Sequence, residues 1–111
     1  MTHLEQLAGL KTRPMRPGEV LADLLDTYDL TQSELAQRLG VGRLTISQLV
    51  NGHRTLTPEM AQRLGRFFGN GAGVWMRLQQ QVDLWDTLHA DLGDYESIEP
   101  LVPDDGELVA A

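Results

Sequence analysis

The chain has 111 residues, of which 41% are apolar and 5% aromatic; it has no cysteine, and its formal net charge is −7. This length suits one domain with tails, and the lack of cysteine excludes disulfides, thiolate metal sites and cysteine nucleophiles. No apolar run is long enough to cross a membrane, and the first residues lack the apolar stretch of a secretory signal, so we expect a cytoplasmic protein. A leucine-rich composition with few β-branched residues favours an all-α fold.

The negative charge is concentrated at the end of the chain. Seven of the sixteen acidic residues lie in the last 21 positions, whereas all nine Lys and Arg residues precede position 90. Between Thr31 and Arg77, six arginines accompany only two glutamates. Because salt screens charges beyond roughly 8 Å, this local excess governs contact with phosphate. The composition therefore permits a nucleic-acid partner despite the acidic total.

Three segments are predicted along the chain. Residues 1–16 form an N-terminal extension, which ends in two closely spaced prolines. A helical domain spans residues 17–92 and begins with a helix from Pro17, a residue suited to the first helical position, to about residue 28. Residues 93–111 are acidic, interrupted by proline and weakly patterned, which predicts a flexible tail.

Four more helices are predicted inside the domain. Each is placed by apolar residues at helical spacing and by capping signals such as Thr57 followed by Pro58. A glycine-rich stretch at 69–73 is interpreted as a flexible link before the last of them. The predicted ranges are 32–39, 43–50, 58–68 and about 74–92.

Residues 32–51 carry the pattern of two helices joined by a tight turn. Thr31 and Glu34 form a capping box at the start. Ala36 supplies a small residue where the two helices meet, and Gly40 tolerates the positive φ that the turn requires. Apolar residues fix both helices on a shared core, at Leu35, Leu39, Val41, Ile46 and Leu49.

This pattern resembles the helix-turn-helix of lambdoid phage repressors and of the wider Xre family, over about residues 18–69. The resemblance implies a five-helix lambda-repressor-like domain whose third helix enters the major groove of DNA and whose second helix lies across the backbone. The residues in the family's places are Gln32, Ala36, Gly40, Ile46, Leu49, Asn51 and Gly52.

The same resemblance implies two sets of contacts with double-stranded DNA. Base contacts would come from the outer side of the third helix, where Arg43 could pair with guanine, Gln48 with adenine and Leu44 with a thymine methyl, together with Ser47. The alternative is that these side chains form an ordinary solvated helix face. Contact with bases is favoured because the strip has no acidic residue and includes the apolar Leu44. The backbone contacts would be Gln32, Thr45, Asn51, His53 and Arg54.

A longer pattern resembles the antitoxins of the HigA type. It includes the run Pro17 to Leu21, Arg54, the run Phe67 to Gly69, and Trp75. This resemblance implies a type II toxin–antitoxin module, in which a dimer binds its own operator, represses transcription and neutralises a HigB-type mRNA endonuclease. The alternative is a stand-alone Xre-family regulator or phage-type repressor without a toxin partner. The extension and the acidic tail distinguish this chain from short members of the family.

The helix predicted at 74–92 has a broad apolar stripe. We expect Trp75 and Leu78 in the domain core and Val82, Trp85 and Leu88 partly in a homodimer interface. The alternative is that the whole stripe closes the core. A symmetric dimer would place two recognition helices about 34 Å apart, as an inverted-repeat operator requires.

The two ends of the chain leave several roles open. The tail either keeps the protein in solution or wraps a basic toxin, with Tyr95, Ile98, Leu101 and Val102 as apolar anchors. The extension, with Lys11, Arg13 and Arg16, is a DNA-backbone arm, a toxin contact or a disordered segment.

An enzyme is not expected from this sequence. His3, His53 and His89 do not have the spacing of metal ligands. The chain also lacks a P-loop, a nucleophile elbow and a dinucleotide-binding fingerprint. The sequence therefore predicts neither a metal nor another cofactor.

Overall fold

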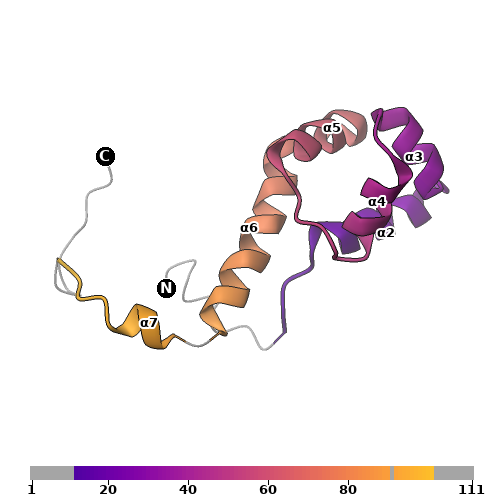
Figure 1. Ribbon diagram of the computed structural model, residues 1–111. Helices are drawn as coiled ribbons and strands as arrows, with labels where there is room; N and C mark the ends of the chain where they lie inside the picture. The colour runs from indigo at the N-terminus through magenta and orange to yellow at the C-terminus, as the bar shows by residue number, and fades with distance from the viewer. Residues whose placement is uncertain (1–11, 91, 102–111) are drawn as a thin grey trace.

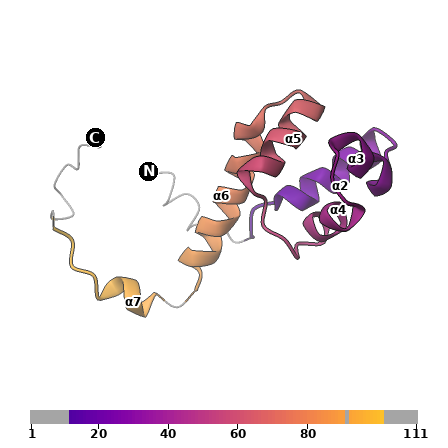
Figure 2. The same cartoon turned by 45° about the horizontal axis from the view of Figure 1, so that its top comes forward.

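The computed structural model describes residues 12–90 and 92–101, and every secondary-structure element in this part of the chain is a helix. The elements, labelled as in Figure 1, are α2 (Pro17–Thr27), α3 (Gln32–Leu39), α4 (Arg43–Val50), α5 (Pro58–Phe68), α6 (Ala72–Leu88) and α7 (Gly93–Glu96). The first three are grouped together, and α5 packs on α6, which extends away from them (Figures 1 and 2). The predicted five-helix domain is confirmed, with α7 as an additional turn in the tail.

Local chemistry explains where the helices of the turn motif begin and end. The Glu34 backbone N–H donates to Thr31 Oγ1 at 3.0 Å, and the Thr31 N–H donates to Glu34 Oε1 at 3.2 Å. This is the predicted capping box, which satisfies backbone donors that the first turn of a helix leaves free. Gly40 ends α3 with φ of 73°, in the left-handed region that favours glycine.

One apolar core joins five helices. The indole of Trp75 is fully buried, and its Nε1–H donates to Asn70 Oδ1 at 2.9 Å, so burial leaves no orphaned donor. Leu78 packs against the same cluster, as predicted. The buried members are Leu21, Leu25, Leu35, Ala36, Leu39, Ile46, Leu49, Leu56, Met60, Ala61, Leu64 and Trp75.

The connection between α5 and α6 is tighter than the sequence suggested. Gly69 and Gly71 have φ of 76° and 82°, and the Gly71 N–H donates to the Gly65 carbonyl at 3.1 Å. A side chain at Gly65 would run into the Gly71 backbone, so glycine allows the two helices to approach. The flexible link predicted at 69–73 is therefore a closed turn. The following helix ends at Leu88, earlier than the predicted residue 92.

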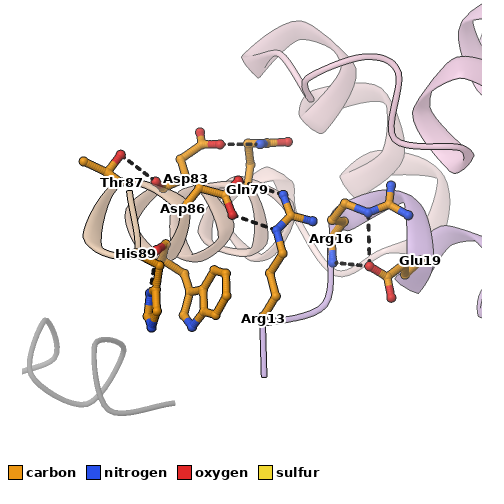
Figure 3. A network of polar contacts seen from close by, with 9 residues as sticks. Arg13, Arg16, Glu19, Gln79, Asp83, Asp86, Thr87 and His89 are labelled. Atoms are coloured by element: carbon orange, nitrogen blue, oxygen red, sulfur yellow. Dashed lines mark hydrogen bonds and ion pairs between the residues drawn. The ribbon is translucent and has the colours of Figure 1, made fainter. Parts of the chain in front are cut away.

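The segment before α2 folds back onto the far part of α6 (Figure 3). Arg13 donates through Nε and Nη2 to the two carboxylate oxygens of Asp86, both at 2.8 Å. This hydrogen bonding holds the pKa of Asp86 below its ordinary value and raises that of Arg13. Arg13 is thus engaged within the chain, whereas Lys11 lies outside the described residues.

The described part of the tail is exposed from Gly93 to Leu101. Its hydrogen bonds are local, as between Ser97 Oγ and the Asp94 carbonyl at 2.7 Å. The predicted anchors Tyr95 and Ile98 are 54% and 67% exposed, which leaves them accessible, and Val102 lies outside the described residues. Within the part that the structure describes, no helix is long and apolar enough to span a bilayer.

Candidate nucleic-acid interface

The outer side of α4 forms an accessible strip. Arg43 and Leu44 are exposed, the latter by 68%, and Ser47 and Gln48 are half-buried. These positions share one side of the helix because residues four apart lie one turn from each other. Ile46, at the centre of the opposite side, is fully buried. The structure therefore brings the four predicted base-contact residues together; their contact with bases stays a prediction.

Close packing fixes the angle of α4 relative to α2. A Cβ atom built on Gly18 would meet the Leu49 backbone, with the carbonyl carbon at 2.8 Å and the oxygen closer still, and the Val50 Cα at 3.0 Å. Only glycine allows the start of α2 to approach the end of α4 so closely. Before the first residue of α4, the Val41 N–H donates to the Ala36 carbonyl at 3.0 Å and closes the turn after α3.

The segment that follows α4 is held against the domain at both ends. Gly52, with φ of 77°, turns the chain so that the His53 N–H donates to the Gln48 carbonyl at 2.8 Å. Leu56 is buried, and its N–H donates to Gln79 Oε1 of α6 at 3.0 Å. The exposed residues between these points, His53 and Arg54 among them, are presented beside the strip.

Two pairs of hydrogen-bonded side chains within this surface were not predicted from the sequence. Arg54 donates to Gln48 Oε1 through Nε at 3.2 Å and through Nη2 at 3.0 Å. Asn51 Nδ2 lies 3.4 Å from Ser47 Oγ and donates to it. Gln48 and Arg54 are six residues apart, a spacing that does not bring side chains together on a helix. The turn at Gly52 brings them into contact, so helical spacing does not predict this pair.

The remaining predicted backbone contacts surround the strip. Gln32 is the first residue of α3 and half-buried, at a helix end that favours anions through its free amides. Thr45 is half-buried in the first turn of α4, and Asn51 is exposed at its end. None of the predicted contact residues is buried in the core. Their contact with phosphate stays a prediction.

Comparison with known proteins identifies this arrangement. The sequence model of the helix-turn-helix family matches residues 21–73, from within α2 to the start of α6. The antitoxin HigA-1 of Vibrio cholerae is 37% identical over 92 residues, which cover 82% of this chain and 87% of that protein.

The chain belongs to the HigA-type helix-turn-helix family.

Two further relatives extend this assignment. The helix-turn-helix-type regulator YbaQ of Escherichia coli K12 is 43% identical over 75 residues, which is 67% of this chain and 66% of YbaQ, so the match spans just under two thirds of that relative. The structure of the Pseudomonas aeruginosa antitoxin HigA with the higBA promoter superposes with a TM-score of 0.72 and 39% identity, covering 81% of this chain and 100% of that one.

The predicted dimer surface of this HigA-type chain needs one correction. Val82 is only 2% exposed and lies in the chain's own interior. The segment before α2 lies against this part of α6: Arg13 binds Asp86 one turn beyond Val82, and Arg16 and Pro17 line the same pocket as Val82. Trp85 and Leu88 are half-buried and keep accessible surface. They remain the predicted dimer contacts.

Proposed function

We propose that this HigA-type protein binds its own operator as a homodimer, represses transcription and neutralises a HigB-type toxin. The observation that carries the DNA-binding part is the accessible strip of α4, whose angle is fixed by packing against glycine backbone at its far end. A helix held in this way can enter a major groove with four adjacent side chains directed at base edges. The relative solved with its promoter supports the same role.

The test of operator binding uses a labelled duplex from the region upstream of the gene, with fluorescence anisotropy at several salt concentrations. Affinity should fall as salt rises, because arginines that neutralise phosphates release counterions. Arg43→Ala should cost about 1–3 kcal/mol and relax the preference at one base pair. Arg66→Ala, an exposed arginine in α5, is the control. Affinity that ignores salt would contradict the proposal.

The homodimer is supported by the accessible apolar surface at the end of α6. Trp85 stacks on His89, with ring centroids 3.9 Å apart, and Leu88 is half-buried beside them. Leu88→Glu should convert the dimer into a monomer in sedimentation and weaken binding to an inverted repeat, because a buried charge is costly. Leu88→Met, which keeps the volume, should remain dimeric. A wild-type monomer at micromolar concentration would contradict this part.

Toxin binding is supported by the named antitoxin relative and by the acidic tail. Seven acids in the last 21 residues suit a basic partner. Removal of residues 93–111 should weaken the binding of a co-transcribed basic protein and leave operator affinity unchanged. Equal toxin affinity of the full and shortened chains would exclude the tail as the toxin contact.

A second candidate function is a stand-alone regulator without a toxin. It is favoured by the match to YbaQ, which is described as a transcriptional regulator. The reading frame next to the gene distinguishes the two functions, since an antitoxin requires a partner gene. Growth arrest on expression of the neighbouring gene, relieved by this chain, would support the toxin–antitoxin module.

A further inference from the structure

The bond between Arg54 and Gln48 determines which part of the Gln48 amide faces outward. Two of the three guanidinium nitrogens, Nε and Nη2, approach the same side-chain oxygen, at 3.2 and 3.0 Å. Arginine has only donors, so its partner atom must be the amide oxygen and not the nitrogen. The Nε2 amino group of Gln48, which has two hydrogens to donate, is consequently the group left for another partner.

Arg54 is well placed to hold this orientation. The backbone on one side of it is fixed by the bond from the His53 N–H to the Gln48 carbonyl, at 2.8 Å. On the other side, the bond from the Leu56 N–H to Gln79 Oε1 fixes the chain to α6. The guanidinium therefore approaches Gln48 from a segment that is anchored before and after it.

The other polar residues of the strip also offer hydrogen-bond donors. Arg43 offers donors only. Ser47 Oγ accepts from Asn51 Nδ2 at 3.4 Å, which leaves its own O–H to donate. Leu44 adds an exposed apolar side chain, and α4 contains no Asp or Glu. The outer side of α4 thus combines donors with one apolar contact.

We infer that Arg54 is a positioning residue that makes Gln48 a donor, so that Gln48 recognises guanine, the base whose major-groove edge presents two acceptors. Guanine presents the acceptors N7 and O6, whereas adenine presents one acceptor, N7, beside the N6 amino donor, and thymine presents O4 alone. Adenine is paired by glutamine through both the amide oxygen and the amide nitrogen, and Arg54 occupies that oxygen. This inference rests on the proposed DNA binding and replaces the adenine contact expected for Gln48.

The experiment selects binding sites from a duplex library with a randomised centre, using the full-length protein and sequencing the bound fraction. Gln48→Ala identifies the base position that this residue reads, since the preference there should disappear. At that position the wild type should favour a G·C pair over an A·T pair by about fivefold, the value of roughly one hydrogen bond. Arg66→Ala should select the same sites as the wild type.

Arg54→Ala is the decisive variant. With the amide oxygen free, its preference at the Gln48 position should change to include adenine, so the ratio of G·C to A·T pairs falls to about one. Arg54→Lys keeps a donor for the oxygen and should retain the wild-type preference. In the double variant Gln48→Ala with Arg54→Ala, the base preference should equal that of Gln48→Ala alone.

Two results would overturn the inference. The first is a wild-type preference for an A·T pair at the Gln48 position. The second is an Arg54→Ala protein that binds all sites more weakly but keeps the wild-type preference, because Arg54 would then act as a phosphate contact only. Enrichment of no sequence by a wild-type protein with its full helical signal would instead refute the proposed DNA-binding function itself.

Discussion

Replacing Gly18 with alanine tests the packing that sets the angle of the recognition helix α4. The added Cβ atom would lie 2.8 Å from the Leu49 carbonyl carbon and 3.0 Å from the Val50 Cα, and closer still to the Leu49 oxygen. Carbon atoms in contact prefer about 3.5–4.0 Å, so α2 and α4 must separate by about 1 Å. Both obstacles are backbone, which no side-chain rotation can remove. We expect Gly18→Ala to lower the free energy of unfolding by about 1–3 kcal/mol, the usual cost of overpacking.

Gly73→Ala is the matched control. Gly73 is the second residue of α6, as Gly18 is of α2, but its Cβ atom would meet only the mobile end of Arg77, with Nη1 at 3.3 Å. This variant should be neutral or more stable by up to about 1 kcal/mol, because alanine favours helix. Urea unfolding followed by circular dichroism measures both. With a slope of about 1–3 kcal/mol per molar, the midpoints should differ by about 1 M.

The same variants should differ in operator affinity, because a displaced α4 would carry its proposed contact residues away from the base edges. Coincident unfolding midpoints for Gly18→Ala and Gly73→Ala would refute the argument that the Leu49 backbone limits the approach. Lower stability with unchanged operator affinity would show that the angle of α4 is not critical for binding.

Three further changes have defined outcomes. Asp86→Asn removes the ion pair with Arg13. Because the pKa of Asp86 is lowered in the folded chain, the pair stabilises the fold at pH values above the ordinary carboxyl pKa of about 3.9. This stabilisation is lost as the pH falls through the lowered pKa. In urea unfolding at pH 7, the variant should therefore lose at most about 1 kcal/mol of unfolding free energy, and at acid pH it should lose none. A difference between variant and wild type that persists undiminished at acid pH would contradict the pairing. Gly40→Ala places a side chain at φ of 73° and should lower stability by about 1–2 kcal/mol in thermal unfolding, whereas no loss would show that the turn relaxes. Gln79→Ala removes the acceptor of the Leu56 N–H and should speed hydrogen exchange at that amide, and unchanged exchange would mean that burial alone protects it.

Signals contained within a few consecutive residues predicted the fold well. The capping box of Thr31 with Glu34 and the left-handed Gly40 each act through neighbouring backbone, so their chemistry is visible in the sequence. The five helices of the domain and the accessible position of Arg43 followed from such signals. The start of α5 after Thr57 was predicted in the same way, and the hydroxyl of this residue accepts from the Met60 N–H at 3.2 Å.

Features that depend on distant segments could not be predicted. Val82 is buried beneath a segment whose position depends on Arg13 and Asp86, which are 73 residues apart. The role of Gly18 becomes visible only when the backbone that crosses it is known. The orientation of the Gln48 amide depends on a turn outside its helix. Each of these is a property of tertiary packing, which neither helical spacing nor local propensity encodes.

α6 takes part in two contacts at different points along its length, and one of them is the hydrogen bond from the Leu56 N–H to Gln79. Through Gln79 the helix supports the connection beside the strip proposed to face DNA, and through its end it offers the surface proposed for a second copy. If dimerisation tilts α6, the side-chain amide of Gln79 transmits this tilt directly to the connection between α4 and α5. The spacing between half-sites and the fit of each half-site would then be adjusted together, so a substitution in α6 far from the nucleic acid can alter which operators are tolerated.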